Sequence, residues 1–193
     1  MPVGATGVIE NYFQSLLDGA PPIWTSSVVI RREVFNNLGG FPPLLRAEDT
    51  AFWSLMALSY PIAFANVMSA TFHMDADTAY RATMRLLLVH EDDARHVLSP
   101  LDKALADGLL PNAIAAAVRR YRQKRLGEMI RQNLMCGQPD LARRLFAEFG
   151  HGISENLLLD PRVSLYLAAT LLPTVIPKTY WGMHHRLWSA LKR

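Results

Sequence analysis

The apolar positions of this chain follow one pattern before residue 76 and another after it. Residues Trp24–Ile30 form a run rich in β-branched side chains that ends where charge begins, which predicts a strand. Residues Glu33–Leu38 place three apolar side chains on one helical face ahead of two glycines, which predicts a short helix. A second helix is expected over Thr50–Leu58 and a second strand over Tyr60–Phe64.

From Asp77 onward the apolar residues recur at every third or fourth position, so only helices are expected there. Pro111 restarts a long helix, and the turn Gly137–Asp140 ends it and starts another, which predicts an αα-hairpin. The sequence therefore predicts an α/β fold that is mostly α. Its two parts are an α/β region over residues 1–76 and an α-helical region over residues 77–193 with a basic, aromatic tail.

An acidic pair, Glu48 and Asp49, stands between the turn Phe41–Pro43 and the second expected helix. Because prolines hold such a turn extended, we expect the pair on a loop at the head of that helix. The positive end of a helix dipole suits charged carboxylates. A general base also needs a charged carboxylate at neutral pH, so this pair is the first candidate for chemistry.

Four motifs surround this pair in order along the chain. They are Ser26–Arg32, Gly39–Phe41, Glu48-Asp49-x-x-x-Trp53 and Tyr60–Phe64. This order resembles the C-terminal, acceptor-side part of the family-2 glycosyltransferases, which have the GT-A nucleotide-diphospho-sugar transferase fold. The resemblance covers roughly the first 80 residues, the size of a subdomain. It implies inverting transfer of a sugar from a nucleotide-sugar donor to an acceptor hydroxyl, as in the synthesis of cell-envelope polysaccharides.

The resemblance also implies roles for single residues. Asp49 would remove the proton from the acceptor hydroxyl, with Glu48 beside it. Ser26, Arg31 and Trp53 would contact the substrate. The indole ring could stack on an acceptor sugar, although a tryptophan at such a position is more often part of the core.

A divalent metal, Mg²⁺ or Mn²⁺, would stabilise the leaving diphosphate in the complete enzyme. His73 is the candidate ligand because some GT-A enzymes take a late metal ligand near this end of the sheet, although a lone histidine is more often structural. No cofactor is expected on this chain alone. The stretch Asp75–Asp77 follows the acidic loop, so we interpret it as a linker and helix N-cap.

Two features depart from the family pattern. Leu55 stands where family members often carry arginine, so a basic group for a phosphate or an acidic acceptor is missing or comes from elsewhere. The family's nucleotide-binding half precedes the acidic motif, and the residues before Trp24 are too few for a βαβ unit. We therefore expect a partial enzyme that binds the donor and a glycan or lipid-linked acceptor together with an N-terminal half it lacks.

Composition limits the cellular compartments and the kinds of partner that are expected for this chain. The chain of 193 residues is 50% hydrophobic and 19% charged, below the ~25% charge of typical domains. Some apolar surface is therefore expected to meet a partner or a membrane, unless the core is large. The single Cys136 and an N-terminus without a secretory pattern favour the cytoplasm. A net charge of +3 without a nucleic-acid motif argues against nucleic acid as a partner.

Two basic segments are candidates for peripheral binding to an anionic membrane on its inner face. The first lies in the long expected helix and is either a lipid or phosphate patch or a solvated face. The second follows Asp160, where cations alternate with aromatics, as suits the headgroup layer. The cations are Arg119, Arg120, Arg122, Lys124, Arg125 and Arg131 in the first segment, and Arg162, Lys178, Arg186, Lys192 and Arg193 in the second. The alternative to an enzyme is a non-catalytic helical interaction or membrane-docking module that retains a relic of the transferase fold.

Overall fold

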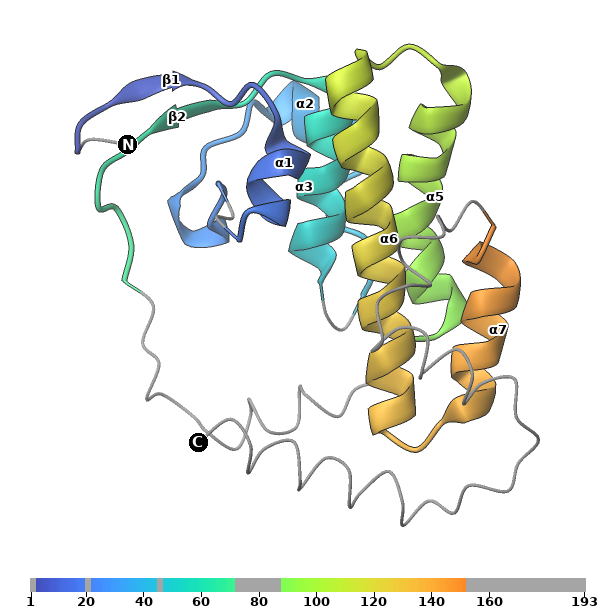
Figure 1. Ribbon diagram of the computed structural model, residues 1–193. Coiled ribbons are helices and arrows are strands. Elements are labelled where there is room, and N and C mark those ends of the chain that lie inside the picture. Colours follow the sequence, from blue (N-terminus) through green and yellow to red (C-terminus); the bar gives the residue numbers. More distant parts are fainter. Residues whose placement is uncertain (1–2, 20–21, 45–46, 72–87, 152–193) are drawn as a thin grey trace. The chain divides into compact units, whose positions relative to one another are not determined.

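The computed structural model describes residues 3–19, 22–44, 47–71 and 88–151, and most of these residues are helical (Figure 1). The elements are β1 Thr6–Val8, α1 Tyr12–Leu17, the 3-10 helix η1 Thr25–Ser27, α2 Arg32–Asn37, α3 Glu48–Ser59, β2 Ala63–Ala65, α5 Glu91–Asp107, α6 Asn112–Met135 and α7 Pro139–Phe149. The mostly-α class expected from the sequence is confirmed. The described strands form one two-stranded sheet, so the GT-A assignment stays a prediction.

The chain forms two compact units. One contains residues 1–78 and 95–122, and the other contains residues 79–94 and 123–193. The boundary expected at residue 76 falls within residues 72–87, outside the described part of the chain. The first unit thus takes in most of α5 and the first half of α6.

The prediction of a strand over Trp24–Ile30 was wrong. Residues Thr25–Ser27 form a 3-10 helix, and Val28–Ile30 continue without strand pairing. The alternation of buried and exposed side chains expected of a strand is present, since Val28 and Ile30 pack against the core while Val29 is 99% exposed. A strand also needs a neighbour for its backbone hydrogen bonds. No described strand lies beside this segment.

The second expected strand is present in shortened form. Strand β2 pairs antiparallel with β1, with Gly7 opposite Phe64. The Phe64 ring lies 3.0 Å from where a Cβ at Gly7 would stand, so a larger residue at this position would require the ring to shift. This ribbon joins the start of the chain to the segment that follows α3 (Figure 1).

Both short helices predicted around the acidic pair are confirmed as α2 and α3. The chain leaves α2 through Gly40, which has a φ of 74° and lies under the Phe35 ring. A Cβ there would stand 3.0 Å from that ring, in a backbone conformation that side chains disfavour. Glycine therefore lets the chain turn back beneath Phe35 and enter α3.

Aromatic side chains form the core of the first unit. Phe13 of α1 and Phe52 of α3 are each 1% exposed, and Trp53 is 3% exposed. They share one cluster with Leu101 of α5 and Val118 of α6. Full burial of each large side chain stabilises the fold by about 1.5–3 kcal/mol, so this cluster holds α3 against the two long helices.

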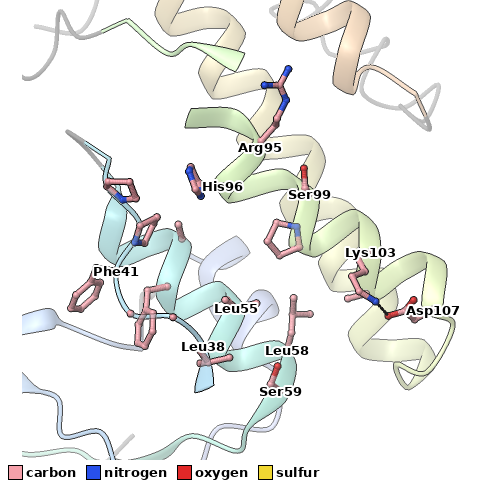
Figure 2. Close-up of a pocket in the computed structure, with 18 of the residues that line it drawn as sticks. Leu38, Phe41, Leu55, Leu58, Ser59, Arg95, His96, Ser99, Lys103 and Asp107 are labelled. Carbon is pink, nitrogen blue, oxygen red and sulfur yellow. Dashed lines mark hydrogen bonds and ion pairs between the residues drawn. The ribbon is translucent and has the colours of Figure 1, made fainter. Parts of the chain in front are cut away.

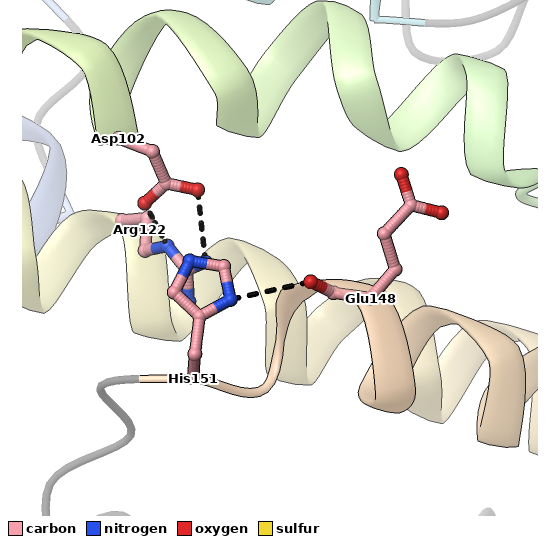
Figure 3. Close-up of polar contacts among 4 residues, drawn as sticks. All are labelled: Asp102, Arg122, Glu148 and His151. Atoms are coloured by element: carbon pink, nitrogen blue, oxygen red, sulfur yellow. Dashed lines mark hydrogen bonds and ion pairs between the residues drawn. The ribbon is translucent and has the colours of Figure 1, made fainter.

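A buried ion pair joins α5 to α6 within the first unit. Arg122 Nε and Nη2 donate to the two carboxylate oxygens of Asp102 over 2.7 and 3.0 Å (Figure 3). The Arg122 side chain is 4% exposed, so it does not belong to the basic surface patch expected on this helix. The parallel fork geometry is the strong form of such a pair.

Helices α6 and α7 form the αα-hairpin that the sequence predicted. The residues of these helices that belong to the second unit form the apolar core of that unit. The turn between them contains Gly137 with a φ of 71°, as expected after a helix end. The buried residues of this core are Leu126, Met129, Ile130, Leu134, Leu141, Ala142, Leu145 and Phe149. His151, after α7, lies 3.2 Å from the Glu148 carbonyl oxygen (Figure 3).

None of the helices in the described ranges is long and apolar enough to cross a bilayer.

Two polar contacts hold the start of α5, and the residues just before it, against α6 and α7 in the second unit. Asn133 is fully buried, and its amide both donates to and accepts from the backbone of Val89 over 2.8 Å. Arg144 of α7 pairs with Glu91. A hydrogen bond from the backbone, followed by the contact with Arg144, holds the pKa of Glu91 below its ordinary value.

The substitution Asp102→Asn is expected to lower the free energy of unfolding by about 3 kcal/mol, because Arg122 is then buried without its charged partner. Urea denaturation followed by circular dichroism measures this loss. The matched substitution Asp107→Asn breaks the exposed pair with Lys103 and should cost less than about 1 kcal/mol. Equal losses from both substitutions would contradict the structural importance of the buried pair.

The substitution Glu91→Gln is expected to reduce the acid sensitivity of the fold. A carboxylate with a lowered pKa stabilises the folded state above its unfolded pKa of about 4.3, and this contribution disappears as the pH falls through the folded pKa. At pH 7 the variant should be less stable by about 0.5–1 kcal/mol, and near pH 3 the difference should be smaller, because protonation of Glu91 removes the contribution of its charge. Urea denaturation at both pH values tests this, with the exposed Glu33→Gln as the control. A constant difference across this range would contradict the prediction.

Candidate active site

Asp49 is the second residue of α3, so the acidic pair lies in the first turn of the helix and not on the preceding loop, where the proline turn predicted it. The residue before the helix, Ala47, has a φ of 63°, the one left-handed non-glycine conformation among the described residues. Its side chain cannot cap the helix. Backbone strain of this kind costs about 1–3 kcal/mol and clusters at functional sites. The chain therefore enters α3 in a conformation that propensity alone would not select.

Three hydrogen bonds fix the Asp49 carboxylate. The backbone amide and the hydroxyl of Thr50 donate to Oδ1 over 2.6 and 3.2 Å. The Thr25 hydroxyl donates to Oδ2 over 2.9 Å. An ionised carboxylate has about four acceptor positions, so the donors among the described residues leave one open on Oδ2. An additional hydroxyl can bind there as a donor.

Sequence reasoning missed Thr25. Its hydroxyl reaches Asp49 from 24 residues earlier in the chain, across the 3-10 turn η1. We predicted a strand over Trp24–Ile30, and a strand would not have formed the turn that brings the Thr25 hydroxyl to Asp49. No local pattern in the sequence signals this contact, because it depends on how η1 packs beside the start of α3.

The other candidate residues lie in different surroundings. Glu48 is half-buried at the start of α3, and Ser26 is exposed in η1 beside Thr25. The Arg31 side chain is 84% exposed and lies 3.7 Å from Glu33. The structure therefore brings Ser26 and Glu48 to the neighbourhood of Asp49, whereas the described contact of Arg31 is with its own helix.

Trp53 lies in the core and presents no open face for stacking on a sugar. Its ring packs edge-on against Phe41 and Phe52, with centroids 5.6 and 5.2 Å away. This corrects the substrate-binding role that the resemblance implied. The burial has a packing cause, because the ring fills the space between α3 and the turn after α2.

The described residues contain no cluster of three or more histidine, cysteine or acidic side chains that could hold a metal ion. His73, the candidate ligand, lies outside the described residues, as does the stretch Asp75–Asp77. The basic, aromatic tail after Asp160 also lies outside them. These three expectations remain predictions from the sequence.

Comparison with protein-family models, with curated proteins and with solved structures found no match to this chain. The function of the candidate site therefore follows from its own geometry. That geometry is one oriented carboxylate at the start of a helix, with an acceptor position open.

Proposed function

We propose that the chain is the acceptor-side part of an inverting glycosyltransferase, in which Asp49 removes the proton from an acceptor hydroxyl. The observation that carries the proposal is the Asp49 carboxylate, held by Thr25 and Thr50 with one acceptor position open on Oδ2. A positioned carboxylate of this kind can accept a hydrogen bond from a substrate hydroxyl and then take its proton. The order of sequence motifs around the acidic pair supports the sugar-transfer chemistry.

In this proposal the acceptor oxygen attacks the anomeric carbon of a nucleotide sugar as Asp49 takes the proton. The bond from the anomeric carbon to the donor phosphate breaks, and nucleoside diphosphate leaves with its electron pair. Mg²⁺ or Mn²⁺, bound mainly by the donor-binding half of the complete enzyme, would supply charge for that leaving group. The nucleotide-binding half of the family fold would bind the donor, and the complete enzyme would act at the cytoplasmic face of a membrane.

The substitution Asp49→Asn keeps the shape of the side chain and removes its basicity. In the complete enzyme, turnover should fall by roughly 10²- to 10⁴-fold, the usual contribution of a positioned general base. The assay measures nucleoside diphosphate released from a panel of nucleotide sugars with Mn²⁺. A membrane extract of the source organism supplies the acceptor.

The matched control is Glu48→Gln, which alters the neighbouring acid of the same helix turn and should keep turnover within a few-fold. Survival of Asp49→Asn together with loss in Glu48→Gln would assign the base to the other acid. Full turnover in both variants would show that neither acid is the base and would contradict the proposal.

Thr25 is a positioning residue in this proposal. The substitution Thr25→Val removes one hydrogen bond to a charged group and keeps the size of the side chain, so turnover should fall about ten- to hundredfold. Thr25→Ser restores the hydroxyl and should recover most of the loss, which a merely structural defect would not show. The same assay measures both variants, and equal loss in valine and serine variants would contradict the role of the hydrogen bond.

A further inference from the structure

Strand β1 uses only one of its two edges in the described part of the chain. The Ala5 carbonyl accepts from the Asn66 amide over 2.7 Å, and the Ile9 amide donates over 2.8 Å to the carbonyl just before β2. Because bonding residues alternate along an antiparallel ribbon, Thr6 and Val8 direct their backbone N–H and C=O groups away from β2. All of β1 is exposed, and no other described strand lies beside it. The outer edge of β1 is therefore open (Figure 1).

This edge lacks the features that usually prevent pairing with another chain. Proteins protect an open edge with charged side chains, with proline or with a bulge. Residues 3–9 contain neither a charged residue nor a proline. The outer edge of β2 is different, because the Ala65 carbonyl already accepts from the Val67 amide over 2.9 Å. Strand β1 is thus the better place for an additional strand.

Exposed apolar side chains gather around the same ribbon. Nine large apolar side chains are exposed in the described part of the chain, and four of them lie in the ribbon or just beyond it. These four are Val3, Val8, Val67 and Met68. The edge therefore combines open backbone groups with apolar surface, which is the combination that strand addition uses.

We propose that β1 pairs in antiparallel fashion with β1 of a second copy of this chain, about a twofold axis at Gly7. In this register Thr6 of one copy lies opposite Val8 of the other, so each copy bonds through every open backbone group of β1. A second copy suits the edge because the strand is neutral, and because Glu10 falls opposite Gly4 of the second copy and not opposite another acid. Such an interface is closed, since both copies use the same surface.

Gly7 permits the close approach that this register requires. The two Gly7 residues would form a pair without mutual hydrogen bonds, in which the Cα atoms are about 4.5 Å apart. The Phe64 ring leans over Gly7 and lies 3.0 Å from where a Cβ would stand. The Phe64 rings of the two copies would therefore approach each other across two residues that have no side chains. Glycine inside a strand often marks such an approach of another backbone.

Sedimentation equilibrium of the full chain, from micromolar to millimolar concentration, tests the proposal. A short strand pair buries little surface, so we expect a weak, reversible dimer. The substitution Val8→Pro removes an outward N–H and leaves the hydrogen bonds to β2 intact. One bond is then lost from each copy, so the dissociation constant of the dimer should rise about tenfold or more.

The matched control is Ala63→Pro, which removes an outward N–H from the other edge of the same ribbon. It should leave the dissociation constant within about twofold. Circular dichroism verifies that each variant folds. If Val8→Pro does not fold, Thr6→Lys replaces it, because this substitution puts a charge of the same sign on both copies near the axis and should also weaken the dimer.

Amide hydrogen exchange, followed by NMR, locates the contact. The amides of Thr6 and Val8 should exchange more slowly as the concentration of the chain rises, because pairing protects them. The amides of Ala63 and Ala65 face the other edge and should exchange at a constant rate. Protection of these two alanines in place of Thr6 and Val8 would overturn the proposal and assign the contact to β2.

Three further results would contradict pairing through β1. They are a chain that stays monomeric at millimolar concentration, equal loss of dimer in Val8→Pro and Ala63→Pro, and assemblies that grow beyond the dimer. Protection of Thr6 and Val8 in a monomer would assign the edge to another segment of the same chain. Asp49→Asn lies outside the ribbon and should leave the dissociation constant within about twofold, so this result is independent of the proposed function.

Discussion

Burial of Phe52 and Trp53 is the constraint on which the rest of the first unit depends. These neighbouring residues of α3 are 1% and 3% exposed and pack among the rings of Phe35 and Phe41. Their cluster reaches Leu101 of α5 and Val118 of α6. Because α3 is fixed in this way, its first turn presents Asp49 beside Thr25. Residues farther along the same helix, from Ala51 to Ser59, line a groove between α3 and α5 (Figure 2). Loss of this packing would disturb both sites together.

Much of the local structure could be predicted from the sequence. The apolar spacing and the glycine and proline breaks predicted α2, α3, α6 and α7. The acidic pair was expected on a loop at the head of a helix, and it lies in the first turn of that helix, α3. These features depend on residues close together in the chain, which is why periodicity and capping rules identify them.

Features that depend on distant contacts could not be predicted. The Thr25 hydrogen bond to Asp49 spans 24 residues, and the Arg122 pair with Asp102 spans 20. The run at Trp24–Ile30 has strand-like composition but forms a 3-10 turn, because pairing requires a neighbouring strand. From the sequence we placed Arg122 among the surface cations. In the structure it is buried, because the Asp102 carboxylate pairs with it. The sequence gives the number of charged residues, whereas packing determines which of them are exposed to solvent.

The central claim is that Asp49 acts as the base in a direct displacement at an anomeric carbon. The most direct test is proton NMR of the glycoside that the complete enzyme forms from an α-linked nucleotide sugar. The account predicts a β-linked product, because a hydroxyl activated by a base attacks from the side opposite the leaving diphosphate and inverts the centre. An α-linked product would contradict the account, because retention requires a different mechanism in which a single base at Asp49 is not sufficient.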